Sequence, residues 1–258
     1  MSVTTEHGDE IIEKYLSGIG CETIAQEYGC YRSTIHRFLK RNNVPIRKLN
    51  EYRKYSLNEH VFDVLDTEEK NYFLGLMYAD GFNVAGKNEF GLALSGEDGY
   101  MVEKFQKFFE TDRPIMHHAP SLGRGQEVHE IRLNSEHVSN RLTELGCPPQ
   151  KSFKIEFPTF LEDKYVRDFI RGYLDGDGSI YSINKYGKRI DILGTCDFCT
   201  NVQEIIYNKL NIKSFMAQSG NIYSLRFSRI EDINKFYHWI YDDATIFLLR
   251  KYKKFSEK

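Results

Sequence analysis

Hydrophobic positions along the chain follow two spacings, and both spacings return about a hundred residues later. Apolar residues three or four positions apart predict helices, whereas apolar residues at alternate positions predict strands. The helical spacing occurs at Val102, Phe105, Phe108 and Phe109, and again at Val202, Ile205, Ile206 and Leu210. The alternating spacing occurs at Phe90, Leu92 and Leu94, at Ile190 and Ile192, and at Tyr223, Leu225 and Phe227. The pattern therefore predicts two similar halves, each with the order helix, two strands, helix, two strands, helix.

Alignment of the chain with itself supports these two halves. The segment YFLGLMYADGF, residues 72–82, matches part of DFIRGYLDGDGSI, residues 168–180, at an offset of 97 positions. Further on, IRLNSEHVSNRL matches LRFSRIEDINKF at an offset of 94, and the difference falls in the loop 119–127. Two such copies are typical of an internal structural repeat. Because alternating strands bury only one face, we expect an α+β fold in which each copy is an antiparallel sheet with helices on one face and an open polar face.

A small helical module precedes the repeats. Three short helices are predicted between residues 10 and 41, with stops at Gly18, Gly20 and Gly29. The stretch IAQEYGCYRSTIHRFLK resembles a helix-turn-helix, in which the first residues of the second helix contact base edges. We therefore assign residues 8–46 to a DNA-binding helix-turn-helix module, although modules of this size also dock proteins. Its predicted DNA contacts are Tyr31, Arg32, Ser33, His36 and Arg37.

Charge is distributed unevenly, although the net charge is only −2. The segment 30–55 carries +7 and the tail 250–258 carries +4, which leaves −13 on the rest of the chain. Basic segments of this kind either face solvent or contact phosphates. We interpret residues 47–67 as a basic linker, in which Arg47 and Lys48 follow the DNA backbone.

Composition indicates a folded protein inside the cell. Hydrophobic content of 41% is enough for a core, and no apolar run approaches the roughly 18 residues that a membrane span needs. The N-terminus lacks the basic and apolar regions of a secretory signal, and the five cysteines are scattered. Cys196 and Cys199 form one CxxC without a second pair at zinc spacing, so we expect two half-buried thiols there. We expect a cytoplasmic, nucleoid-associated protein that is not secreted.

Small residues and carboxylates recur at the same places in both copies. Gly75 and Ala79, and likewise Gly172 and Gly176, lie on one helical face, where small residues allow two helices to approach closely. Close packing would bring together the acids that follow, which are Asp80 and Asp177. Two carboxylates at the negative ends of helix dipoles are unfavourable unless a cation neutralises them, and a hard ion such as Mg²⁺ suits an all-oxygen site.

A calcium loop is excluded as an alternative explanation of RGYLDGDGSI. Counted from Asp175, an EF-hand needs glycine at its sixth position and glutamate at its twelfth, but the chain has Ile180 and Tyr186. The open faces of the sheets are instead expected to contact DNA, through Arg132, Ser179, Arg189, Ser224 and Arg226.

The two motifs, FLGLMYADG and IRGYLDGDG, resemble those of a single-chain LAGLIDADG homing endonuclease, over about residues 68–255. The resemblance implies two αββαββα repeats, at 68–150 and 165–258, joined by a linker at 151–164. Related by a pseudo-two-fold axis, their sheets would form a saddle over the major groove of double-stranded DNA. It also implies a monomer that recognises a long target site. The helix-turn-helix module lies outside this family fold.

The resemblance further implies an active site at the helix ends. Asp80 and Asp177 take the position of the metal-binding acids, with Mg²⁺ or Mn²⁺ as the cofactor. The backbone carbonyls of Ala79 and Gly176 are expected to complete the ligand set. Each strand of DNA would be cut across the minor groove, with short 3′ overhangs. A basic residue stands near each site in the family. Its counterparts are Lys151 and Lys251, with Lys253 and Lys254 as alternatives to the second.

One position departs from the motif, because Tyr78 stands where the second copy has Asp175. That position is not the metal ligand, so we expect asymmetric packing at the helix ends. Three other functions remain open. The scaffold also suits a non-catalytic DNA-binding transcription regulator or an intron RNA maturase. His129, Asn134 and His137 favour an HNH-type nuclease only weakly, since they lack its metal-binding context.

Overall fold

The computed structural model describes residues 3–46, 54–120, 125–184 and 187–256. The chain divides into two compact units, Met1–Lys54 and Tyr55–Lys258, and each is described by itself. Among the described residues, no helix has both the length and the apolar character needed to cross a membrane.

The described part of the first unit, residues 3–46 and 54, contains four helices. They are α1 (Val3–Glu6), α2 (Gly8–Leu16), α3 (Cys21–Glu27) and α4 (Arg32–Arg41). Its core is small, and consists of Ile11, Tyr15, Cys21, Ile24, Ala25, Ile35 and Leu39. The sequence predicted only three helices here, between residues 10 and 41. Helix α1 was missed because four residues are too short to show a periodicity.

The first repeat of the second unit begins with a long buried helix. Its elements are α5 (Glu68–Ala79), β1 (Gly81–Val84), β2 (Glu89–Ser95), η2 (Gly96–Asp98), α6 (Gly99–Phe108), β3 (Met116–His118), β4 (Val128–Asn134) and α7 (Glu136–Glu144). The Thr67 hydroxyl caps α5 by accepting from the Lys70 N–H, 3.3 Å away. Every residue of α5 from Asn71 to Ala79 is buried, so this helix lies inside the unit.

The second repeat has the same order of elements. After η4 (Lys151–Phe153) and η5 (Asp163–Tyr165) come α8 (Val166–Asp177), β5 (Gly178–Asn184), β6 (Gly187–Gly194), α9 (Cys196–Leu210), β7 (Phe215–Ser219), β8 (Ile222–Phe227), α10 (Ile230–Tyr241) and α11 (Leu249–Ser256). The predicted αββαββα architecture is therefore confirmed in both repeats, with α11 as an addition.

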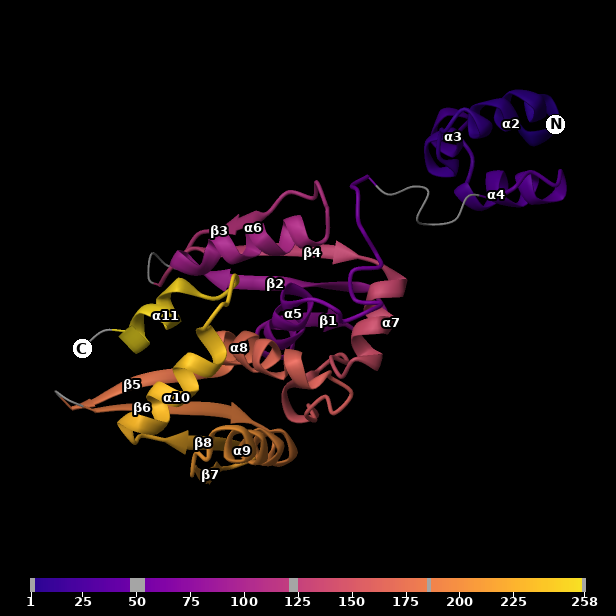
Figure 1. Ribbon diagram of the computed structural model, residues 1–258. Coiled ribbons are helices and arrows are strands. Elements are labelled where there is room, and N and C mark those ends of the chain that lie inside the picture. Colours follow the sequence, from indigo (N-terminus) through magenta and orange to yellow (C-terminus); the bar gives the residue numbers. More distant parts are fainter. Residues whose placement is uncertain (1–2, 47–53, 121–124, 185–186, 257–258) are drawn as a thin grey trace. The chain divides into compact units, whose positions relative to one another are not determined.

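Two antiparallel sheets flank the central helix pair α5 and α8 (Figure 1). Their strand orders, β1-β2-β4-β3 and β5-β6-β8-β7, are equivalent. Residues that alternate along the strands, such as Phe90, Ile131, Ile190 and Leu225, are buried in one continuous core with α5 and α8. The opposite face of each sheet carries the polar residues.

A buried arginine ties the repeats together in a way that the sequence did not reveal. Arg171 of α8 is fully buried, and its guanidinium contacts Glu68 of α5 at 2.7 Å and Asp168 at 2.9 Å. It also donates to the backbone carbonyls of Ile240 (2.6 Å) and Ile246 (2.9 Å). The charge is thus fully paired, and α5, α8 and the end of α10 are fixed to one another.

Candidate active site at the ends of two central helices

Two glycines bring the backbones of α5 and α8 into direct contact. A Cβ atom at Gly75 would collide with the carbonyl oxygen of Phe169, and a Cβ at Gly172 would collide with that of Tyr72. The two collisions are reciprocal, since each glycine faces the backbone of the opposite helix. Any larger residue at either position would force the helices apart.

This close packing carries the acids to the same end of the helix pair. Asp80 is the C-cap of α5, and Asp177 is the last residue of α8. A Cβ at Gly176 would lie 3.0 Å from Asp80 Oδ2 and would collide with the Ala79 side chain. The small residues therefore make room for a carboxylate at the crossing point of the two helix ends.

The electrostatics of the two carboxylates indicate mutual repulsion. Partial burial and the negative charge of Asp177 raise the pKa of Asp80 to about 6, against the opposing effect of Lys151 and Lys251. Burial also raises the pKa of Asp177. The Asp80 side chain still reaches solvent, while the surrounding protein removes part of its hydration. The pair is thus accessible, and its negative charge is incompletely balanced by the protein.

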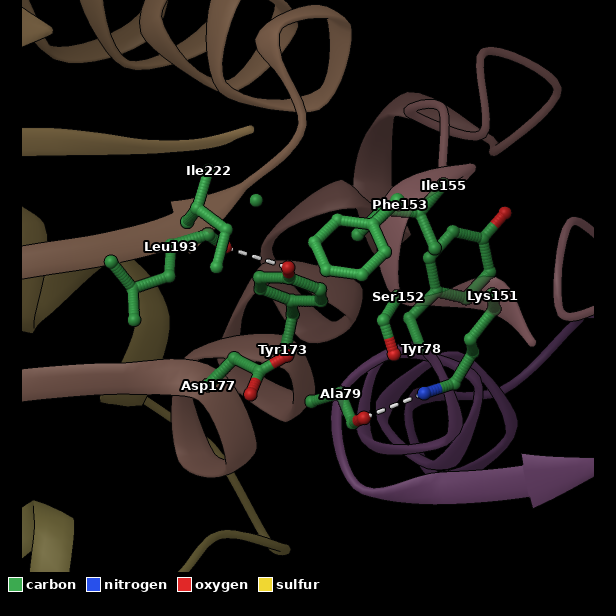
Figure 2. Close-up of a pocket in the computed structure, with 11 residues that line it drawn as sticks. Tyr78, Ala79, Lys151, Ser152, Phe153, Ile155, Tyr173, Asp177, Leu193 and Ile222 are labelled. Carbon is green, nitrogen blue, oxygen red and sulfur yellow. Dashed lines mark hydrogen bonds between the residues drawn. The ribbon is translucent and has the colours of Figure 1, made fainter. Parts of the chain in front are cut away.

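Each helix end also holds a lysine. Lys151 Nζ of η4 donates to the Ala79 carbonyl oxygen at 2.7 Å (Figure 2). Lys251 Nζ of α11 donates to the carbonyl oxygen of Leu174 at 3.3 Å and to that of Gly178. Burial lowers the pKa of Lys151, and burial together with the charge of Arg250 lowers the pKa of Lys251 to about 8.

The two lysines differ in exposure and in their carbonyl partners. Lys251 is buried, whereas Lys151 is only partly buried. Among the lysines considered for the second site, Lys253 and Lys254 are exposed, so Lys251 alone occupies the helix end. Lys151 engages the carbonyl of Ala79 that was expected to serve as a ligand.

The departure from the motif, at Tyr78, has a structural explanation. The Tyr78 hydroxyl donates to the Leu145 carbonyl oxygen at 2.6 Å, and so anchors the segment that leads from α7 to Lys151. In the second repeat, the Leu248 N–H donates to Asp175 Oδ2 at 2.6 Å, and so anchors the segment that carries Lys251. Equivalent motif positions therefore hold the two lysine segments by different chemistry.

Asp175 is a structural residue. Its carboxylate is buried, and Tyr72 donates to its Oδ2 at 2.8 Å. Burial raises its pKa to about 6, in spite of these donors. The sequence ranked Asp175 below Asp177 but did not reveal this anchoring role, because Leu248 lies 73 positions away.

A recess lies beside the first lysine. It is bordered by Tyr78, Ala79, Lys151, Ser152, Phe153, Ile155, Tyr173, Asp177, Leu193, Gly194 and Ile222. Figure 2 shows Lys151 and Asp177 on its border, with the Tyr173 hydroxyl donating to the Leu193 carbonyl oxygen at 2.6 Å. The recess thus borders Asp177 but not Asp80, and its wall is partly aromatic.

On the open face of the first sheet, Arg132 is paired with two acids. Its guanidinium contacts Glu89 at 2.8 Å and Glu130 at 2.6 Å, and its Cζ lies 5.1 Å from the centre of the Phe82 ring. Phe82 reaches over Gly91, whose missing side chain leaves the space. The guanidinium is thus held in position, with 41% of the side chain exposed.

The second sheet repeats this arrangement with other residues. Asp191 accepts from Arg189 Nε at 2.7 Å and lies 3.1 Å from Arg226 Nε. Arg189 Cζ lies 5.1 Å from the centre of the Tyr181 ring. The sequence analysis named the arginines of the open polar faces but not these acids, which offset part of the positive charge. The sequence did contain a signal for these acids. Residues two positions apart on a strand share a face, so Glu130 had to lie beside Arg132 and Asp191 beside Arg189.

The two predicted serine contacts lie in different environments. Ser179 of β5 is partly buried, near the helix end that carries Asp177. Ser224 is only 5% exposed, and its hydroxyl accepts from Arg226 Nε at 3.0 Å. Ser224 therefore shares a face with Arg226, as strand alternation predicted, but its side chain is buried and supports the arginine.

In the first unit, the predicted contact residues gather at the start of α4. Tyr31 is the N-cap residue and is 83% exposed, and the Arg37 Nε donates to the Ser33 carbonyl oxygen at 3.2 Å. An open hollow is bordered by Arg32, Ser33, His36 and Arg37. Arg47 and Lys48 lie outside the described residues.

Sequence comparison gives one distant relative. No family model matches the chain. The DNA-directed RNA polymerase subunit Rpo1C of Methanocaldococcus jannaschii is 24% identical over 154 residues. That match covers 60% of this chain but only 17% of the subunit, so the subunit's activity is not carried over.

Solved structures with a similar fold were found at low sequence identity. Full-length WhiA from Thermatoga maritima gives a TM-score of 0.50 at 16% identity, over 77% of this chain and 62% of WhiA. The N-terminal LAGLIDADG domain of WhiA alone gives 0.46 at 15% identity, over 71% and 89% of the two chains. The I-LtrWI LAGLIDADG homing endonuclease bound to target DNA gives 0.49 at 15% identity, over 77% and 89%. Together with the two αββαββα repeats and their equivalent sheets, the likeness to WhiA shows that this chain has the LAGLIDADG fold.

Proposed function

We propose that the second unit is a site-specific endonuclease that hydrolyses both strands of DNA with a divalent metal ion and leaves short 3′ overhangs. One observation carries the proposal. Asp80 and Asp177 lie at the same end of a tightly packed helix pair, and a lysine is bound to the backbone at each of these helix ends. Acids and bases gathered beside an accessible recess are typical of a catalytic site.

The residues present fit a hard divalent cation. Carboxylate oxygens are the ligands that Mg²⁺ prefers, and Mn²⁺ accepts the same set. The raised pKa of Asp80, to which the charge of Asp177 contributes, indicates that the lysines do not fully compensate the pair. Asp80 and Asp177 would hold the ion. When bound, it would supply an activated water molecule and stabilise the leaving oxygen of a phosphodiester.

The lysines have a separate role in this proposal. Hydrogen bonds to backbone carbonyls hold Lys151 and Lys251 at the helix ends, so their positive charge is oriented before DNA binds. This charge would stabilise the negative charge that develops on the phosphate. The pKa of Lys251, about 8, also allows it to exchange a proton near neutral pH.

The partner proposed is double-stranded DNA with a long site, bound by a monomer. Each open sheet face would contact one half of the site, with Arg132 on the first sheet and Arg189 and Arg226 on the second. Arginines of fixed orientation are suited to guanine edges and phosphates. In the first unit, the start of α4 would make further contacts with DNA.

The experiment that tests the proposal is selection of cleaved sequences from a genomic or random DNA library, with the full chain and Mg²⁺. The recovered site is then cut by the parent protein and by Asp80→Asn and Asp177→Asn. Loss of cleavage in both variants is expected. Asp163→Asn serves as a matched control, because it makes the same change at a surface position away from the motifs. Asp163 Oδ1 there lies 2.5 Å from Lys209 Nζ. If the two motif variants cut as well as the parent, the assigned site is wrong.

A second candidate function is a DNA-binding transcription regulator without catalysis. The observation in its favour is the first unit, in which Arg32, Ser33, His36 and Arg37 of α4 border one open hollow and would contact DNA without any metal. Footprinting of the selected DNA, without cleavage in Mg²⁺ or Mn²⁺, would favour the regulator over the nuclease.

A further inference from the structure

Two histidines and an aspartate meet outside the proposed nuclease site. His60 Nδ1 lies 2.7 Å from Asp63 Oδ2, and His137 Nε2 lies 2.6 Å from Asp63 Oδ1. The imidazole rings are 5.0 Å apart, centre to centre. One ligand atom from each of the three residues lies within 4.8 Å of the others. This spacing allows all three to reach a common ion without a change of backbone.

The turn that carries His60 and Asp63 is anchored by other contacts. Between these residues, Val61 is 7% exposed and Phe62 is 1% exposed, because both belong to the core. Arg141 of α7 donates from Nε to the Phe62 carbonyl oxygen at 3.1 Å and from Nη2 to the Asp63 carbonyl oxygen at 3.3 Å. The backbone positions of His60 and Asp63 therefore do not depend on the bond between Asp63 and His137.

His137 is fixed just as firmly in the first turn of α7. The Ser135 hydroxyl caps this helix by accepting from the Val138 N–H at 3.2 Å, and the Val138 side chain is buried. The same hydroxyl is bonded to Glu59, beside His60 in the turn. Two segments more than seventy positions apart are thus held together around the three ligand atoms, and this preorganisation is what a metal site requires.

The chemistry of the three groups selects the class of ion. Their side chains are 74%, 37% and 44% exposed, so an ion has access and positions remain open to water. Two imidazole nitrogens with one carboxylate form a ligand set typical of Zn²⁺ and related transition-metal ions, whereas Mg²⁺ favours oxygen alone. We propose that His60, Asp63 and His137 bind one Zn²⁺ or a similar transition-metal ion, in a site separate from Asp80 and Asp177. Such an ion would fasten the turn that precedes α5 to α7.

A second group of similar composition provides a control. His117 Nδ1 lies 3.3 Å from Glu127, and His129 Nε2 lies 4.0 Å from it, on the hairpin of β3 and β4. These separations are longer, and Glu127 comes from a loop, with 50% of its side chain exposed. We therefore expect this group to bind a transition-metal ion more weakly than the first.

The test is calorimetric titration of the metal-free full chain with Zn²⁺ alone, followed by cobalt(II) absorption spectroscopy. The parent is expected to bind Zn²⁺ at one dominant site, and His60→Ala, Asp63→Asn and His137→Ala are each expected to weaken it by at least about 10-fold. His117→Ala is the matched control and should bind as the parent does. Thermal unfolding without metal verifies that each variant is folded.

Stability provides a second readout that does not depend on nuclease activity. Zn²⁺ should raise the Tm of the parent and of His117→Ala but not that of His137→Ala, since an ion that binds the folded state stabilises it. The proposal is overturned if the parent binds no Zn²⁺. It is also overturned if the His60 and His137 variants bind as the parent does, or if only His117→Ala loses binding.

Discussion

Replacing Asp80 by asparagine is expected to stabilise the metal-free protein at neutral pH and to abolish cleavage. Asparagine keeps the size of the side chain but removes a negative charge from the place where it faces Asp177. A residue that serves only the fold would have the opposite effect, because its removal destabilises the protein. The sign of the change therefore tests whether the charge of Asp80 is unfavourable in the metal-free folded state.

The pH dependence follows from the pKa of Asp80, which rises from 3.8 in the unfolded chain to about 6. Between these values the folded state binds more protons than the unfolded state, so the free energy of unfolding falls as pH increases. Above about pH 6 this loss of folding free energy is complete. Converting the whole pKa shift at about 1.36 kcal/mol per unit would overstate the loss, because Asp80 reaches solvent. We therefore expect a loss of about 1 kcal/mol. For a unit of this size, that corresponds to a Tm difference of about 2–4 °C.

The measurement is thermal unfolding of parent and Asp80→Asn in chelator at pH 5 and pH 7.5, then with Mg²⁺. The variant should have the higher Tm at pH 7.5, and the gap should narrow at pH 5. Mg²⁺ should raise the Tm of the parent more than that of the variant. Asp163→Asn, at an exposed ion pair, should change the Tm little in any condition. A lower Tm for Asp80→Asn in chelator, with no response of the parent to Mg²⁺, would refute the reasoning.

Three further predictions follow from the contacts described. Calorimetry should show that Gly172→Ala destabilises the protein by about 1–3 kcal/mol, because the new Cβ collides with the Tyr72 carbonyl oxygen. Helix propensity alone predicts the opposite, a stabilisation of about 1 kcal/mol. A Tm above that of the parent would therefore contradict the close packing of the two helices. In plasmid cleavage and melting assays, Lys251→Met should lose cleavage and about 1–3 kcal/mol of stability, because buried carbonyls lose their donor. Lys151→Met, at a less buried site, should lose cleavage with a smaller fall in Tm. Equal falls in Tm would contradict the difference in burial between the two lysines. In competition binding, Asp191→Asn should reduce the preference of the protein for its target over scrambled DNA, because Arg189 and Arg226 lose their shared charged partner. An unchanged ratio of the two affinities would show that Asp191 does not orient these arginines.

The fold was predictable from the sequence because its signal is repeated. The spacing of apolar residues predicted the order of helices and strands within each repeat, and the recurrence of the pattern predicted the two sheets. The glycines of the motifs predicted where the central helices cross, since only small residues allow that approach. Helix α11 was not predicted, because eight residues after a repeat carry too little periodicity to distinguish a helix from a tail.

The contacts of the site were harder to predict, because they join positions far apart in the sequence. Asp175 bonds to Leu248, and Tyr78 bonds to Leu145, and neither pair has a local signature. The acids beside Arg132 are a different case. Glu130 shares a strand and a face with Arg132, so the period of two already implied their pairing, but only the arginines were considered.

The two halves of the candidate site are equivalent in topology but not in environment. Each lysine follows the αββαββα elements of its repeat and donates to a backbone carbonyl of its own motif helix. Yet Lys151 borders an open recess and is held through Tyr78, whereas Lys251 is buried and is held through Asp175. Burial lowers the pKa of both ammonium groups, and at Lys251 the charge of Arg250 adds to this effect and brings the pKa to about 8. Only Lys151 borders the recess, so the two groups differ in their access to an approaching phosphate. A symmetric scaffold therefore does not imply two strands of DNA cut at equal rates, and each half of the site has to be assayed by itself.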